Sequence, residues 1–219
     1  MKERFRVERI VDVAGTELPG EPAWHMLRSQ LGIEAFGVNA WTSTEPGQTL
    51  IGEHDEMGNG AGEHEELYVV LSGSATFTVD GVATNVPAGS LVFVKDPTLK
   101  RSAVADTVGT TVLVVGARAG EPFVVSQWER SAEALRYWPG EEWDEAIRLL
   151  AIRLGETPNH AGTVYNLACA EARAGRTDDA FAHLARALEL RPQFIESMQH
   201  DPDLGSIRDD PRFPRPAND

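Results

Sequence analysis

Residues 66–89 read ELYVVLSGSATFTVDGVATNVPAG, and this stretch decides the fold. Two short runs rich in Val, Phe and Thr flank the turn Asp80-Gly81, whose residues tolerate the positive φ angles of a tight hairpin turn. The pair Ser72-Gly73 precedes the first of these runs, and Pro-Ala-Gly follows the second. The stretch therefore predicts a β-hairpin framed by two further turns.

Short runs of the same kind, separated by turn residues, extend over the first half of the chain. We expect strands at residues 5–13, 24–28, 35–42, 67–71, 75–79, 90–95 and 110–115. Many short strands with regular turns are typical of a sandwich, a jelly roll or a barrel. This half is therefore expected to be all-β.

The second half carries a helical period, with apolar stripes in residues 143–155, 163–175 and 177–190. Identical residues lie 34 positions apart in five pairs: Asp144 and Asp178, Ala146 and Ala180, Leu150 and Leu184, Leu154 and Leu188, and Pro158 and Pro192. A period of 34 residues is the signature of tetratricopeptide helix pairs.

Residues 165–192 resemble one full tetratricopeptide repeat, and residues 143–158 resemble the second helix of a preceding one. The first helix of that preceding repeat is expected in 127–138, and a tail helix near 194–199. Fewer than three repeats seldom bury enough surface to stand alone, so we expect them to pack on the strand domain or on a second subunit. A groove that binds a partner peptide is the other interpretation; the small number of repeats favours support of assembly.

These patterns divide the chain into an all-β domain (1–125), a linker with a first helix (126–138) and an all-α domain (139–219). The 219 residues are 42% hydrophobic and 25% charged, as is ordinary for a soluble globular protein. A single cysteine, Cys169, excludes an intrachain disulfide and suits the cytoplasm. A formal charge of -14 argues against nucleic acid or an anionic membrane as the main partner.

The spacing of turn residues around the hairpin is similar to that of a known family. Six residues separate Glu66 from Gly73, and five separate Gly81 from Pro87-Ala88-Gly89. This arrangement resembles the two motifs of the cupin superfamily, whose fold is a small jelly-roll barrel, and the resemblance covers residues 35–117. It implies a cupin barrel, and by analogy with many cupins a homodimer.

The first cupin motif supplies two histidines and a glutamate that bind a divalent metal inside the barrel, and the second motif supplies a third histidine. Glu66 matches the glutamate. Counting back from it without a gap places the two histidine positions on Gly60 and Gly62, which have no ligating side chain. Counting forward from the preceding glycine places them on Glu53 and Asp55.

One extra residue, as a β-bulge provides, places His54 and Glu56 at these positions instead. We prefer this pair because His54 offers a neutral nitrogen donor. His64 lies two residues before Glu66 and is the natural substitute for a further ligand. The position of the third histidine holds Val92, which cannot ligate.

Two functions follow from this mixed ligand set. With Val92 as an apolar wall, the barrel is expected to bind a small molecule at a degenerate metal site, and its expected lining residues are Trp41, His54, Glu66, Tyr68, Val92 and Arg101. An inward-facing Glu66 then needs a partner, for which His54, Tyr68 and Arg101 are candidates. The alternative is a metal-dependent oxygenase, isomerase or lyase that holds Fe, Mn, Ni or Zn with His54, Glu56, His64 and Glu66. Whether the protein is an enzyme stays open.

Overall fold

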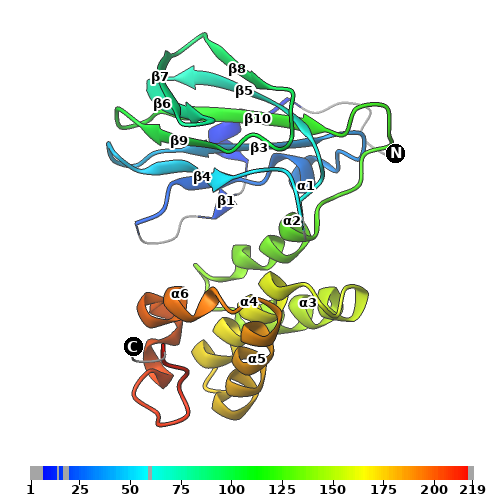
Figure 1. The fold of residues 1–219 in the computed structure, drawn as a ribbon, viewed down its shortest axis with the longest axis vertical. Helices are drawn as coiled ribbons and strands as arrows, with labels where there is room; N and C mark the ends of the chain where they lie inside the picture. Colours follow the sequence, from blue (N-terminus) through cyan, green and yellow to red (C-terminus); the bar gives the residue numbers. More distant parts are fainter. Residues whose placement is uncertain (1–6, 14, 17–19, 59–60, 217–219) are drawn as a thin grey trace. The chain divides into compact units, whose positions relative to one another are not determined.

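The computed structural model describes residues 7–13, 15–16, 20–58 and 61–216. The chain divides into two compact units, Met1–Ser126 and Gln127–Asp219. Strands dominate the first unit and helices the second (Figure 1). None of the helices formed by the described residues is both long and apolar enough to cross a bilayer.

The N-terminal unit consists mainly of short antiparallel strands. They are β1 (Gly15–Thr16), β2 (Ala23–His25), β3 (Gly37–Thr42), β4 (Thr49–His54), β5 (Glu65–Ser72), β6 (Ser74–Val79), β7 (Val82–Pro87), β8 (Leu91–Val94), β9 (Arg101–Ala105) and β10 (Thr111–Ala117), with the helix α1 (Leu27–Leu31) and the 3-10 turn η1 (Ile10–Asp12). One sheet has the order β1-β2-β3-β10-β5-β8, and the other has the order β4-β9-β6-β7. The jelly-roll-like sheets expected for this half are confirmed.

The expected closed barrel is not found. No hydrogen-bonded strand pair joins the two sheets within the described part of the chain. Strand β3 uses both of its edges, because it pairs with β2 on one side and β10 on the other. It has no edge left for β4, which pairs with β9 instead. The two sheets therefore form an open double layer whose interior is filled by side chains.

The hairpin expected at Asp80-Gly81 is confirmed. Asp80 has φ 48° and Gly81 has φ 77°, and β6 and β7 pair directly on either side of this turn. The strand expected over residues 5–13 is wrong where it can be checked, because residues 10–12 form η1, while residues 1–6 lie outside the described part of the chain. The strand expected over 24–28 ends at His25, and α1 follows it.

The core of the N-terminal unit lies between the two sheets. Alternate residues of β5 face inward, so Tyr68 and Val70 are buried there, and the ring of Tyr68 meets Phe77 of β6 edge to face. The buried members of this core are Leu50, Ile51, Tyr68, Val70, Ala75, Phe77, Val86, Val94, Ala103, Ala105 and Val112. The core is apolar apart from one end, where ionisable side chains gather.

The helical unit contains α2 (Gln127–Ala132), η2 (Glu133–Tyr137), α3 (Trp143–Glu156), α4 (Ala161–Arg173), α5 (Thr177–Leu190), α6 (Phe194–His200) and η3 (Pro202–Ile207). Helix α4 packs against α2, α3, α5 and η3, and nine of its thirteen residues are buried. Residues 34 apart occupy equivalent places in α3 and α5. Ala146 and Ala180, and likewise Leu150 and Leu184, are fully buried.

Candidate functional site

The candidate site is formed where side chains of β4, β5 and β9 meet at one end of the inter-sheet space. Glu66 is 8% exposed and lies on the inner face of β5 between Gly116 of β10 and Val94 of β8. Gly116 is paired in turn with Gly37 of β3. A Cβ atom at Gly37 would lie 3.2 Å from the ring of Phe123, so the glycine makes room for this ring beside the site.

Glu66 is held by two side chains. The Tyr68 hydroxyl donates a hydrogen bond of 2.5 Å to Oε2 of Glu66, and Nε of Arg101 lies 3.1 Å from the same oxygen. The Nε–H group of Arg101 does not point at that oxygen, so this contact is an ion pair without a hydrogen bond. Burial would raise the pKa of Glu66, but the interactions with His54, Tyr68 and Arg101 outweigh burial and lower the pKa below its ordinary value.

Arg101 is almost completely buried, with 1% of its surface exposed. It is the first residue of β9, where it pairs with His54 of β4 and Val79 of β6. Its Nη1 donates a long hydrogen bond of 3.4 Å to the Pro97 carbonyl, and its Nη2 is buried without a hydrogen-bond partner. A buried guanidinium with an unused donor is costly, and a bound water molecule, an ion or a ligand is the usual explanation for such a group.

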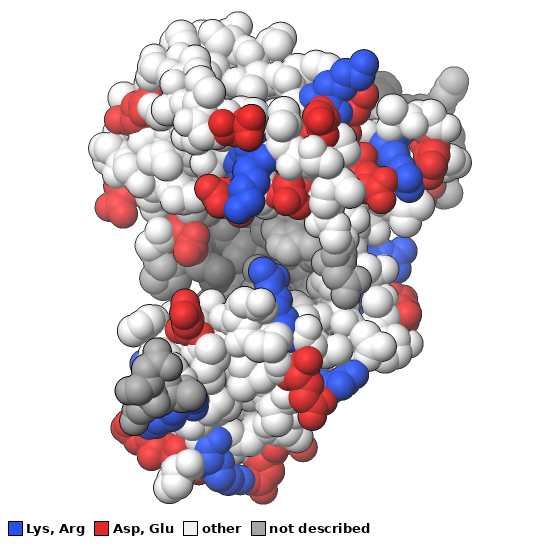
Figure 2. Space-filling view, viewed as in Figure 1, with Lys and Arg blue, Asp and Glu red and all other residues white. Residues whose placement is uncertain are grey.

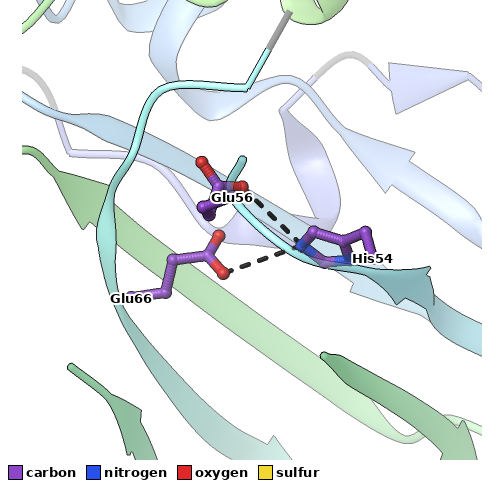
Figure 3. A group of neighbouring side chains, drawn as sticks. All are labelled: His54, Glu56 and Glu66. Atoms are coloured by element: carbon purple, nitrogen blue, oxygen red, sulfur yellow. Dashed lines mark ion pairs between the residues drawn. The ribbon is translucent and has the colours of Figure 1, made fainter. Parts of the chain in front are cut away.

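His54 faces both glutamates (Figure 3). Its Nδ1 lies 2.8 Å from the Gly52 carbonyl, an acceptor, so Nδ1 carries the proton, and in the neutral ring Nε2 keeps its lone pair. Nε2 lies 3.7 Å from Oε1 of Glu56 and 3.7 Å from Oε2 of Glu66. Burial lowers the pKa of His54, but Glu66 and the Gly52 carbonyl outweigh burial and raise the pKa.

Counting along the sequence places His54 and Glu56 at the ligand positions only with one extra residue, as in a bulge, and the pairing of β4 with β9 is indeed irregular on both sides of Ile51. Glu56 follows β4, and its Oε2 accepts a hydrogen bond of 3.1 Å from the Gly62 amide. The same oxygen lies 3.4 Å from Nδ1 of His64. A Cβ atom at Gly62 would overlap the His64 ring, so a larger residue here would push that ring aside.

The donors of His54, Glu56 and Glu66 lie within 4.8 Å of one another and could hold a divalent metal ion. The fit of these side chains to a metal ion is incomplete. His64 does not belong to this group, which leaves one imidazole where the sequence suggests two. The Glu66 oxygen that faces His54 already accepts the Tyr68 hydroxyl. A metal ion would therefore compete with bonds that the chain makes itself.

The other expected lining residues lie at different distances from the cluster. Val92 and Tyr68 are directly opposite on β8 and β5, so Val92 is part of the wall beside the cluster. Trp41 also faces inward, but it pairs with Val112, four pairs further along than the Gly37–Gly116 pair that adjoins Glu66. Trp41 instead stacks on Trp24, with ring centroids 6.3 Å apart. Of the expected lining residues, His54, Tyr68 and Arg101 therefore lie around Glu66, Val92 lies beside them, and Trp41 lies further along the sheet.

Sequence reasoning missed Phe123, whose ring lies 5.6 Å from that of His64. The signal for it was faint: glycines inside strands, such as Gly37 and Gly116, mark places where another group approaches closely. No sequence motif pointed to a second group of metal-ligand side chains, formed in the helical unit by Cys169, Asp201 and Asp203.

Charges of both signs are interspersed over the surface. Figure 2 shows acidic and basic side chains alternating on both units, and on the face in view the described residues form no continuous basic patch. Exposed pairs such as Arg118 with Glu63, at 2.8 Å, contribute little to stability because water screens them.

No protein-family model matches the chain, and no curated protein matches it. Solved structures do resemble it. The neighbours are cupin and double-stranded β-helix proteins. A cupin 2 conserved barrel domain protein from Salinispora arenicola shares 19% identity and a TM-score of 0.42, over 53% of this chain and 92% of its own. A protein from Thermotoga maritima described as a predicted oxalate decarboxylase shares 16% identity and a TM-score of 0.41, over 51% of this chain and 97% of its own.

A third neighbour, a conserved protein with a double-stranded β-helix domain from Klebsiella pneumoniae, shares 19% identity and a TM-score of 0.38. It covers 56% of this chain and 98% of its own. All three matches span about half of this chain, and similarity at this level extends to the fold alone. The reaction named for one neighbour therefore says nothing about the chemistry here.

Proposed function

We propose that the N-terminal unit is a small-molecule-binding cupin whose ligand is anchored by the buried cluster of Glu66, Tyr68 and Arg101. The observation that carries this proposal is the unused Nη2 donor of Arg101, buried inside the double layer. Folding does not leave a charged donor unsatisfied without cost, and a ligand that brings an acceptor oxygen removes that cost.

The cluster reaches solvent through one of its side chains. The His54 side chain is 36% exposed, whereas those of Glu56 and Glu66 are largely covered. Its Nε2 lies too far from either glutamate for a hydrogen bond and is free to bond a ligand. Val92 and Val94 on β8 give the apolar part of the wall, as is usual for small-molecule sites.

The metal site is, on this proposal, degenerate: it holds no ion tightly. The second candidate function is a metal-dependent enzyme that uses His54, Glu56, His64 and Glu66 with Fe, Mn, Ni or Zn. The three donors within 4.8 Å favour it. A bound ion would polarise a ligand oxygen or acidify a water molecule. His54 would then ligate through Nε2, because Nδ1 is bonded to the Gly52 carbonyl.

A thermal-shift screen of small polar molecules, run on untagged protein with and without a chelator, tests the first function. We expect at least one ligand to raise the unfolding temperature equally in both conditions. This ligand should lose its effect in Arg101→Lys but not in Arg148→Lys, the same change at an exposed site of the helical unit. Stoichiometric metal in elemental analysis, with ligand binding abolished by the chelator, would overturn it in favour of the enzyme.

For the helical unit we propose a tetratricopeptide-like array that supports assembly. The equivalent burial of residues 34 apart in α3 and α5 supports this reading. So does the packing of α2 and η3 on α4, which covers faces that an open peptide groove would need. We propose a cytoplasmic homodimer, which light scattering of the full chain tests. A monomer that captures a peptide through the helices would favour the partner-binding alternative.

A further inference from the structure

We propose that Arg101 is the chain's own substitute for a divalent cation, and that this side chain is what makes the site independent of metal. The inference deepens the proposed function, on which it rests for the place of the site but not for the identity of the ligand. It names the residue that decides between a metal-free pocket and a metal centre.

The position of Arg101 carries the inference. Nε of Arg101 and Nε2 of His54 both approach Oε2 of Glu66, at 3.1 Å and 3.7 Å. This oxygen is the one through which Glu66 would meet an ion shared with His54. The positive charge that a metal would bring to Glu66 is therefore already supplied, next to that oxygen, by a permanently charged group.

The strand pairing explains why the guanidinium cannot simply turn away. Arg101 lies on β9 between β4 and β6, so its neighbours on both sides are hydrogen-bonded strands. Its side chain is 1% exposed and crosses to Glu66 on the opposite sheet. On the β8 side, Glu66 faces Val94, which brings no charge. Among the described residues, Arg101 is the permanently charged partner of Glu66.

The charges of the cluster decide whether a divalent ion can bind beside the Arg101 guanidinium. With His54 neutral, Glu56 and Glu66 carry two negative charges and Arg101 one positive charge. A divalent ion placed among the donors must approach this guanidinium, which opposes binding at the moderate dielectric of a half-buried site. Removing the positive charge leaves two carboxylates and one imidazole unopposed, a donor set that suits Zn²⁺ or Mn²⁺.

Titration calorimetry with Zn²⁺ or Mn²⁺ alone, on untagged full-length protein, tests the inference. Arg101→Met should bind one ion roughly tenfold to a hundredfold more tightly than the wild type, because a nearby unit charge is removed. Arg101→Lys keeps the charge and should show no gain. Arg101→Met combined with His54→Ala should lose the gain, which locates the ion at this site.

Arg101→Gln is the second variant in case Arg101→Met does not fold, since its amide can still donate to Glu66 without a charge. An unchanged affinity in the neutral variants, or a wild type that already binds one ion as tightly as they do, overturns the inference. These outcomes are separate from those of the ligand screen. A ligand that binds the wild type without metal supports the proposed function whether or not Arg101→Met gains an ion.

Discussion

The described residues form two clusters of metal-ligand side chains, one in each unit, and these clusters differ in how well their polar atoms are satisfied. In the helical unit, Asp201 accepts a 2.8 Å hydrogen bond from the Tyr165 hydroxyl and a 2.9 Å bond from the Asp203 amide. Asp203 accepts a 2.8 Å bond from Nε1 of Trp138. Burial raises the pKa of Cys169, so its sulfur stays a thiol, a poor metal ligand.

The cluster around Glu66 has the opposite character. It contains a buried guanidinium with an unused donor and an imidazole nitrogen 3.7 Å from two carboxylates. Close spacing of metal-ligand side chains is thus shared by a structural cluster and a candidate site. Unused hydrogen-bonding capacity is what separates them.

The largest expected effect comes from Glu66→Ala. The change leaves Arg101 buried without its counter-charge, and we expect the free energy of unfolding of the N-terminal unit to fall by about 4 kcal/mol. Urea unfolding, with hydrogen exchange to assign the loss to this unit, measures it. Adding Arg101→Met should restore part of the loss; a cost below about 1 kcal/mol for Glu66→Ala would mean that the pair is not truly buried.

Asp201→Ala is expected to destabilise the helical unit by about 2–3 kcal/mol, because the Tyr165 hydroxyl and the first amide of η3 both lose their acceptor. The exposed Asp209→Ala serves as the control and should change stability by less than about 0.5 kcal/mol. Equal effects of the two changes would contradict a structural role for the cluster in the helical unit.

Tyr68→Phe should cost about 1 kcal/mol, since it removes one hydrogen bond to the Glu66 carboxylate and keeps the ring packing on Phe77. Denaturant unfolding measures this change in the free energy of unfolding. Tyr165→Phe removes the equivalent bond to Asp201 and should cost a similar amount. A neutral result for Tyr68→Phe alone would show that Arg101 suffices to hold Glu66.

The smallest effect is a pH dependence at His183. The buried Glu171, 2.7 Å away, raises the pKa of His183 above its ordinary value. The stabilisation is present in full below about pH 6.5 and is lost as the pH rises through the higher folded pKa. We expect His183→Gln to lose roughly 0.5 kcal/mol at pH 6 and less at pH 8.5, measured by urea unfolding. In a Glu171→Gln background the difference between the two pH values should disappear, and its persistence would refute the assignment.

The local parts of the fold could be predicted from the sequence. The Asp80-Gly81 turn and the strands beside it follow from short-range backbone preferences, and the structure contains them. The alternation of β5 likewise predicts that Glu66 and Tyr68 share an inner face. Barrel closure could not be predicted in this way, because it depends on whether β3 keeps an edge free, and that is decided by its pairing with β2.

The candidate site likewise has a part that the sequence predicts and a part that depends on contacts between distant residues. His54, Glu56 and Glu66 could be placed together by counting along two strands once a bulge was allowed. The direction of the His64 side chain could not be predicted in this way, because its ring packs on Phe123, which is distant in sequence. The strength of the Arg101 contact also depends on the spacing of two sheets, which no local pattern reports.

The ring of Phe123 has one further consequence. It sits over Gly37 and against His64, only a few residues before α2 begins at Gln127. The last residues of the N-terminal unit are thereby packed against the rim of the candidate site. A guest molecule that displaces His64 would therefore also move the Phe123 ring and the last residues of the N-terminal unit.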